Sequence, residues 1–302
     1  MEGWRMKGWK DGRPNPVMLK ELRGQMRGWR AFAVLTVYLF LLSCVAIALY
    51  FSVYTTYAAG TLIGVRAGRT LFSGIVLLEL LLVCFIAPAF TVGAISGERE
   101  RQTYDLLVIT MLRPRSIVVG KLGAALAYIV LLIIAALPLQ SLAFILGGVS
   151  LAELFIALIG LLVTGLVSAS VGLFFSSLVR STVLSTVLTY GVVLFATLGL
   201  PSIAATILIP MSGFLESAMA SWLVQVLLIY GLGFLACTNP FITAVLTEVV
   251  LLEKNAVLFF TVMVDGHSIP LVSPWAVYVL LCLLASLMLI ALSVRLVRAP
   301  RG

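Results

Sequence analysis

The sequence predicts an all-α integral membrane protein with six transmembrane helices. Of its 302 residues, 62% are hydrophobic and only 11% are charged, whereas soluble domains carry about a quarter charged residues. The mean hydropathy is +1.18, and several apolar runs exceed the ~18–20 residues that cross a bilayer. Lysines and arginines gather between particular runs, which adds a prediction of orientation.

Six apolar runs are long enough to span the membrane at about 1.5 Å per helical residue. They cover residues 31–53, 71–95, 122–147, 152–177, 182–200 and 275–297. The third and fourth runs are separated by a tight GGVSL turn. We therefore expect a transmembrane domain over residues 31–297, after a cytoplasmic segment over 1–30 and before a tail over 298–302.

Residues 201–274 are harder to interpret. They hold the apolar stretch WLVQVLLIYGLGFLACTNPF and a second stretch that carries Glu248, Glu253 and Lys254, which makes it a poor span. Either both stretches cross, giving eight spans, or both lie at the outer surface or re-enter the membrane, giving six. Non-helical backbone at membrane depth is tolerated only where protein or a water-filled cavity surrounds it. The charges in the second stretch favour the model with six spans.

The basic residues predict that both chain ends are cytoplasmic. On this topology 17 of the 20 lysines and arginines fall on one side, and only Arg66, Arg69 and Lys254 fall opposite. Cytoplasmic loops carry such an excess. The pI of 9.6 then reflects orientation and anionic lipid, and nucleic acid is not an expected partner.

The segment before the first apolar run predicts an amphipathic helix on the cytoplasmic membrane surface. Asn15 suits the N-cap and Pro16 the first helical position. An apolar stripe follows at spacings of 4, 4 and 3, formed by Met18, Leu22, Met26 and Trp29. Basic residues cover the other faces, as in interfacial helices, although a generic basic anchor has the same composition.

Residues 96–112 place four alternating charges, Glu98 to Arg101, directly after the second apolar run. Gly97 can end that span, and the residues from Arg101 to Thr110 predict an amphipathic helix of about three turns. Pro114 then restarts a helix. Leu106 and Leu107 are costly to leave in water. The segment is therefore either a docking surface for a partner or a solvated loop packed on the chain's own helices.

Few residues are of the kind that carry catalysis or bind metals. The four cysteines show no C-x-x-C spacing and His267 is the one histidine, so no metal site is expected. An intramembrane enzyme would need a nucleophile with a base, or a metal, and is disfavoured. Glu79 lies inside the second run, where a carboxyl group is expensive. It is a candidate for the lining of a transport path or for an interface between helices.

Three segments, NPVMLKELRGQMRG, GAISGERERQTYDLLVIT and SIVVGKL, resemble ABC transporter permeases of the type-2 family, the exporter subunits for drugs, bacteriocins, polysaccharides and lipids. The resemblance implies that the N-terminal helix is a connecting helix on the membrane surface and that the loop after the second span, within 96–121, is a coupling helix seated in a groove of the ATPase. Met111 and Arg113 depart from the family pattern. The coupling residues it implies, with their neighbours, are Gly97, Glu98, Arg99, Glu100, Arg101, Thr103, Tyr104, Asp105, Leu106 and Leu107.

No ATPase motif occurs in this chain, because Gly120-Lys121 is followed by Leu122 where a P-loop needs Ser or Thr. The expected function is therefore the non-catalytic permease subunit of an exporter in the cytoplasmic membrane, without a cofactor of its own. The resemblance implies separate ATPase subunits that bind ATP and Mg²⁺, and a second permease copy or paralogue as a dimer partner. A secondary transporter or channel without an ATPase is the alternative, and the substrate is not predicted.

Overall fold

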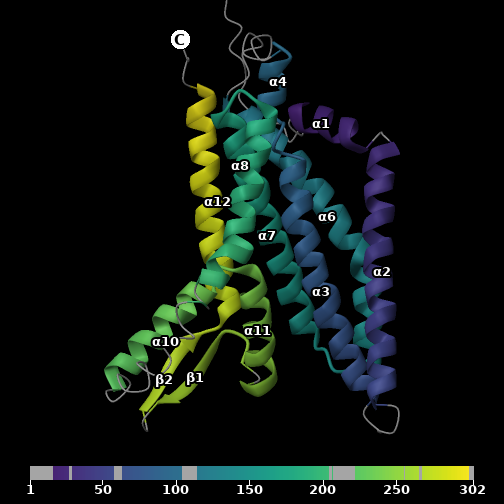
Figure 1. Cartoon of the computed structure of the whole chain (residues 1–302), viewed down its shortest axis with the longest axis vertical. Coiled ribbons are helices and arrows are strands. Elements are labelled where there is room, and N and C mark those ends of the chain that lie inside the picture. The colour runs from purple at the N-terminus through teal and green to yellow at the C-terminus, as the bar shows by residue number, and fades with distance from the viewer. Residues whose placement is uncertain are drawn as a thin grey trace, which may run out of the picture.

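Six long apolar helices run side by side along one axis and form the body of the molecule (Figure 1). The computed structural model describes residues 16–26, 29–57, 63–103, 114–203, 206, 222–254, 256–264 and 267–298. The six helices are α2 (Trp29–Tyr57), α3 (Ile63–Ala89), α6 (Pro114–Leu146), α7 (Leu151–Leu178), α8 (Thr182–Leu194, continued by the π-helix η1, Phe195–Gly199) and α12 (Pro274–Arg298). Each is long enough to cross a bilayer, so the predicted all-α fold with six spans is confirmed.

The bounds of α3 and α6 differ most from the predicted ones. Helix α3 begins eight residues earlier than predicted, at Ile63, and it ends at Ala89 rather than at residue 95. The carbonyl of Pro88 accepts hydrogen bonds from the amides of Thr91 and Val92, which closes the helix into a turn. Helix α6 begins at Pro114 rather than at 122. An apolar run marks only the part of a helix that lies in the hydrocarbon of the bilayer. The polar first turns of α3 and α6 therefore fell outside the predicted spans.

The connection between α6 and α7 is as tight as its sequence predicts. Gly147 and Gly148 have φ angles of 85° and 91°, a region that glycine enters without steric cost. Ser150 then caps α7, with its hydroxyl bound by the Glu153 amide and the Glu153 carboxylate bound to the Ser150 amide. This capping box fixes the start of the helix.

The core lies where α3 and α7 pack between the other long helices. One buried cluster includes Val83, Ile129 and Leu173, and another includes Ile75 and Leu132. Small residues let the helices approach closely, as is common in membranes. A Cβ atom on Gly172 of α7 would lie 2.3 Å from the Thr91 hydroxyl and 3.1 Å from the Pro88 carbonyl.

The region between α8 and α12 forms a small substructure at one end of the bundle (Figure 1). It holds α10 (Trp222–Ala236), α11 (Pro240–Lys254) and an antiparallel hairpin of β1 (Phe259–Val264) and β2 (His267–Val272). With 15 residues each, α10 and α11 are shorter than the ~20 residues of a spanning helix. The predicted six-span alternative therefore holds, and the hairpin is an element that the sequence analysis missed.

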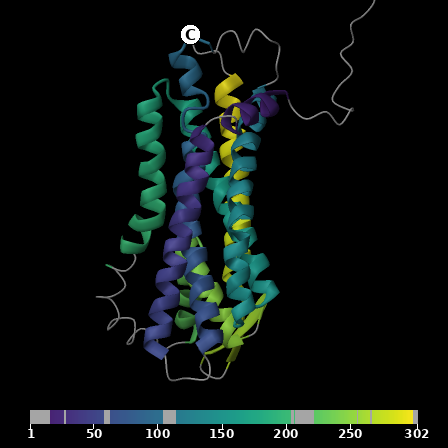
Figure 2. The same cartoon turned by 90° about the vertical axis from the view of Figure 1, so that its right-hand side faces the viewer.

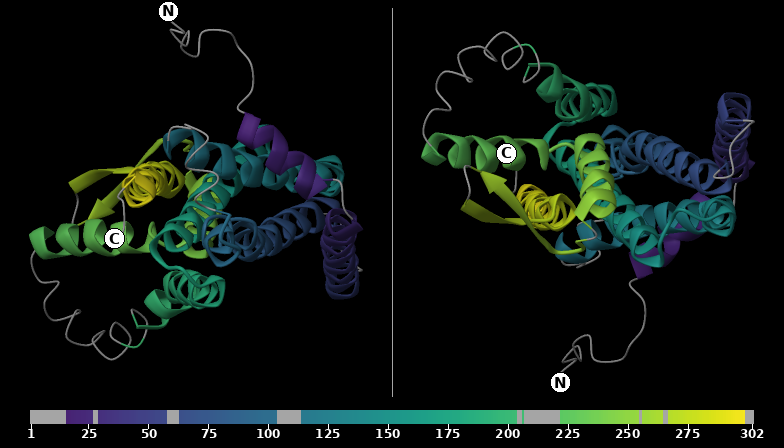
Figure 3. Two further views of the ribbon diagram at one scale, coloured as in Figure 1. Left: turned by 90° about the horizontal axis from the view of Figure 1, so that it is seen from above. Right: turned by 90° about the horizontal axis from the view of Figure 1, so that it is seen from below.

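The opposite end of the bundle holds α1 (Pro16–Met26), the short helix α4 (Ser96–Glu100) and the end of α12. Helix α1 lies across the bundle end instead of continuing α2, as the view from above shows (Figure 3). The turned view shows the long helices nearly parallel, with α8 at the edge (Figure 2). Most of the predicted cytoplasmic cations that the structure describes thus belong to elements at this end. Arg66 and Arg69 lie in the first two turns of α3 and Lys254 ends α11, at or near the other end.

Candidate functional site

Helix α4 is the centre of a polar cluster at the α1 end of the bundle. It is a single turn, and the chain leaves it at Arg101 and reaches a φ of 56° at Gln102. The helix predicted to start at Arg101 is therefore wrong for residues 101–103, which form a turn. Gly97 lies inside α4 and does not end the span. Tyr104, Asp105, Leu106 and Leu107 lie outside the described residues.

Buried hydroxyl groups fix α4 to the end of α7. The amides of Ile95 and Ser96 both donate to Oγ of Ser176, at 2.9 and 3.0 Å. Ser96 and Ser176 are fully buried. The Ser96 hydroxyl donates to the carbonyl of Val92 at 3.1 Å. Because Ile95 and Ser96 stand at the start of α4, Ser176 supplies the acceptor that the free first amides of a helix need.

Two charged side chains of α4 bind the facing ends of α7 and α8. Arg99 donates to the carbonyl of Ser177, in the last turn of α7, at 3.0 Å. Glu100 accepts from the amide and the hydroxyl of Thr182, the first residue of α8, both at 2.7 Å. A cation at a helix C-terminus and an anion at an N-terminus both match the helix dipole. The hydrogen bonds from the Thr182 hydroxyl and amide lower the pKa of Glu100.

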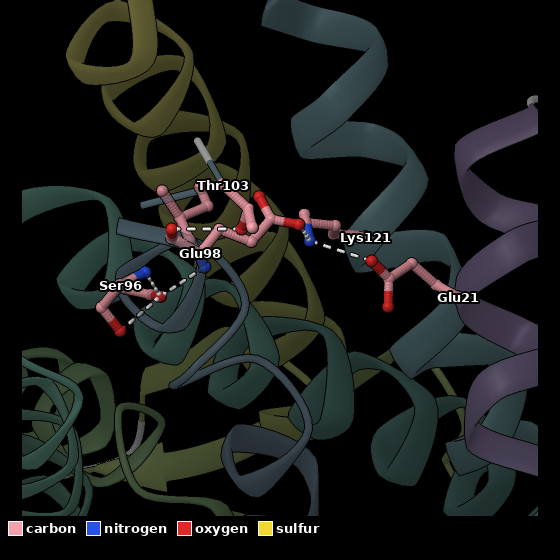
Figure 4. Close-up of polar contacts among 7 residues, drawn as sticks. Glu21, Ser96, Glu98, Thr103 and Lys121 are labelled. Atoms are coloured by element: carbon pink, nitrogen blue, oxygen red, sulfur yellow. Dashed lines mark hydrogen bonds and ion pairs between the residues drawn. The ribbon is translucent and has the colours of Figure 1, made fainter. Parts of the chain in front are cut away.

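Lys121 joins α4 to α1 through two carboxylates. Its ammonium group, on α6, lies 2.8 Å from Oε1 of Glu98 and 2.9 Å from Oε1 of Glu21 on α1 (Figure 4). The Lys121 residue is only 5% exposed. A buried cation is tolerated when paired, so this ion triad is what allows Lys121 at that position.

A polar cavity of about 520 Å³ opens beside the triad, between α1, the turn after α3, and α6. Lys20, Glu98 and Arg101 contribute to its lining. Oε2 of Glu98 is buried and has no hydrogen-bond partner among the residues that the structure describes, while Arg101 is exposed. A buried carboxylate oxygen without a donor favours a ligand or partner group that can donate a hydrogen bond.

The predicted connecting helix is present but shorter than the predicted stripe. Pro16 starts α1 and Met26 ends it, while Trp29 belongs to α2 and is 84% exposed. The stripe is therefore wrong as one continuous helical face, because the chain turns between α1 and α2. Met18 points toward α6, since a Cβ on Gly123 would lie 3.2 Å from its sulfur. Leu22 is half-buried, and Asn15 lies outside the described residues.

Glu79 is fully buried where α2, α3 and α6 meet. It accepts a hydrogen bond of 2.9 Å from the Tyr38 hydroxyl and another from the Gln140 side-chain amide. Of the two roles expected for Glu79, these contacts fit an interface between helices of one chain. They also supply the partners that a carboxyl group needs at membrane depth.

Sequence reasoning did not single out Glu21, Ser176 or Thr182 as site residues. Ser176 and Ser177 form a hydroxyl pair at the end of an apolar run, and such a pair is a signal for capping contacts. No sequence pattern marks Glu21 as a site residue, because its partner Lys121 is 100 positions away in the chain. Among the described residues, no group of three or more His, Cys, Asp or Glu side chains could hold a metal ion.

The structure is that of a multi-pass membrane protein with six spanning helices and a helix that lies across one end. The short helix α4 is held between these helices by hydrogen bonds and by the ion pair of Glu98 with Lys121. The family model of the ABC-2 family transporter proteins matches residues 16–299, so the chain belongs to that family. It is a membrane permease subunit of an ABC transporter, of a kind that associates with an ABC ATPase. No curated protein matches this chain.

Proposed function

We propose that this chain is the transmembrane subunit of an ABC exporter of the cytoplasmic membrane. Separate ATPase subunits, which bind ATP and Mg²⁺, dock at the α4 end. A second permease copy or a paralogue completes a dimer, and both chain ends are cytoplasmic. Membership of an ABC transporter family favours this function over a secondary transporter or channel without an ATPase.

The observation that carries the proposal is the bracing of α4. Four of its five residues, with the Ile95 amide before them, contact α7 through Ser176 and Ser177, α8 through Thr182, and α6 through Lys121, which also binds Glu21 of α1. A protein that pushes on α4 therefore moves the ends of four helices together.

The distribution of charge supports docking at this end. Glu100, Arg101 and Arg115 are exposed at this end and carry charges of both signs. Such mixed charges favour a specific orientation of a soluble partner more than they add affinity. ATP-driven closure of two ATPase subunits would then shift the population of two permease states through α4.

Photo-crosslinking from α4 tests this function. A photoreactive residue at Arg101 should capture, in native membranes, a polypeptide that carries a Walker-type ATP-binding motif. The same residue at the exposed Lys254, on α11, is the matched control and should capture no ATPase. Capture of the ATPase from Lys254, or from neither position in an actively transporting membrane, would contradict the proposal.

A further inference from the structure

A second, mostly apolar cavity lies between α3, α7, α11 and the start of α12, toward the end that carries the hairpin. It holds about 80 Å³ of water-accessible space. Its apolar wall includes Phe72, Val76, Leu80, Ile156, Leu251 and Tyr278. These residues come from four helices of one chain.

The lining of this cavity carries a net negative charge. Its charged residues are Arg69 on α3, Glu153 on α7 and Glu248 on α11. Nε of Arg69 lies 3.3 Å from a Glu248 oxygen, and one terminal nitrogen lies 3.8 Å from a Glu153 oxygen. That terminal nitrogen also donates to the Gly148 carbonyl at 3.0 Å. One guanidinium thus faces two carboxylates, which leaves one negative charge for a ligand to balance.

A buried hydroxyl and an aromatic ring complete the polar part. Thr247 lines the cavity and is 5% exposed, and within the described part of the chain its Oγ1 has no hydrogen-bond partner. Buried polar atoms are nearly always bonded, so this hydroxyl fits an acceptor for a donor brought by a ligand. Trp275 also lines the cavity, and its ring face can attract a cation.

The cavity extends along α3 from the charged cluster into the bundle. Arg69 and Leu80 both line it and are 11 positions apart in the helix, which is about 16 Å along the axis. That length and the apolar wall suit one hydrocarbon chain. We propose that this cavity binds a single-chain amphiphile with an ammonium head, whose head lies at Glu248 and Thr247 and whose chain lies along α3.

The chemistry of the head group follows from the charges and donors. An anionic head would face two carboxylates, and a neutral hydroxyl head would leave the negative charge unbalanced. An ammonium group brings a positive charge and three hydrogen-bond donors, which match Glu248 and the Thr247 hydroxyl. The proposal depends on neither the ATPase nor the direction of transport.

Quenching of Trp275 fluorescence tests it in the full-length chain, purified in neutral detergent without phospholipid. The other four tryptophans, Trp4, Trp9, Trp29 and Trp222, are replaced by phenylalanine. The probe is an undecylamine brominated in the middle of its chain, within quenching range of Trp275 beside the head, compared with the matching alcohol and carboxylate. The amine should quench Trp275 at concentrations about tenfold lower than the alcohol or the carboxylate, the ratio by which a charge-assisted contact exceeds a neutral one.

Two pairs of variants separate binding from folding. Glu248→Gln should weaken quenching by the amine about tenfold and leave the alcohol unchanged, whereas Glu253→Gln, exposed on the same helix, should change neither. Gly160 lines the cavity, and a Cβ there would meet nothing within 4 Å. Gly160→Leu should therefore fold and abolish quenching by the amine. Gly231→Leu on α10, where the space is also open, is its control.

Three results would overturn the proposal. Equal quenching by the amine and the alcohol would leave an unspecific apolar cavity. Preference for the carboxylate would make Arg69 the binding group. Quenching by a bromine-labelled ethanolamine phospholipid in vesicles, with none by the free amine, would assign the cavity to a two-chain membrane lipid.

Discussion

Replacing Lys121 by methionine should loosen α4 from the bundle. The substitution keeps a long apolar stem but removes an ammonium group that lies 2.8 and 2.9 Å from two carboxylate oxygens. Removing one member of a fully buried ion pair costs about 3–5 kcal/mol. The side chains of Glu98 and Glu21 are 22% and 31% exposed and keep contact with water, so we expect a smaller cost of about 2–3 kcal/mol.

Hydrogen–deuterium exchange of the backbone amides measures this loss directly. The segment from Ile95 to Arg101 exchanges by local opening, and its amides are bonded to Ser176 and within the turn. A loss of about 2–3 kcal/mol corresponds to exchange roughly 30- to 150-fold faster in that segment. Exchange in the middle of α7 should stay unchanged.

Two further variants show whether the ion pair itself is responsible. Lys20→Met removes an exposed lysine that lines the same polar cavity, and it should change exchange by less than about twofold, as surface substitutions usually do. Glu98→Gln combined with Lys121→Met should cost less than the sum of the two single changes, because both remove the same contact. If the amides from Ile95 to Arg101 exchange in Lys121→Met at the same rate as in the unsubstituted protein, the claim that the Lys121 ion pair holds α4 in place is refuted.

Three further experiments test separate parts of the structure. Glu79→Leu removes the acceptor of the Tyr38 hydroxyl and should lower the stability of the purified chain by about 1–2 kcal/mol in thermal unfolding; unchanged stability would show that this contact contributes nothing. Gly172→Ala should destabilise by about 1–3 kcal/mol through overpacking, whereas Gly160→Ala on the same helix, with open space, should be neutral or slightly stabilising. Because the pKa of Glu100 is lowered in the folded protein, the contact of Glu100 with α8 should be present above the unfolded-state pKa of this carboxyl group and lost as the pH falls through its folded-state pKa. Amide hydrogen exchange at the start of α8, corrected for the intrinsic pH dependence of exchange, should show this loss. Glu100→Gln should abolish the pH dependence.

The spanning helices could be predicted because each one carries its own signal. An apolar run such as residues 152–177 reports its burial in lipid regardless of what it packs against, and α7 occupies almost the same residues. The ends were less predictable. Helix α3 reaches back to Ile63 past Arg66 and Arg69, because Arg69 finds carboxylates on α7 and α11, and no local pattern shows such distant partners.

The candidate site was located from the sequence, but its contacts were not. The alternating charges after the second span marked the segment that forms α4, and two explanations, docking or packing on the chain's own helices, stayed open. The structure shows that Glu98, Arg99 and Glu100 are all engaged inside the chain. The charges therefore position α4, while Glu100 and Arg101 stay exposed at its end. The hairpin was missed because an apolar stretch beside a membrane span has the same composition as a helix.

Thiol labelling in intact cells tests the central claim most directly, namely that α4 faces the cytoplasm, where an ATPase subunit can bind it. Arg101→Cys and Lys254→Cys place single exposed thiols at opposite ends of the bundle, in a chain whose four natural cysteines are replaced. A membrane-impermeant maleimide added outside should label position 254 and leave position 101 untouched until the membrane is opened. Labelling of position 101 from outside would invert the topology and contradict the account.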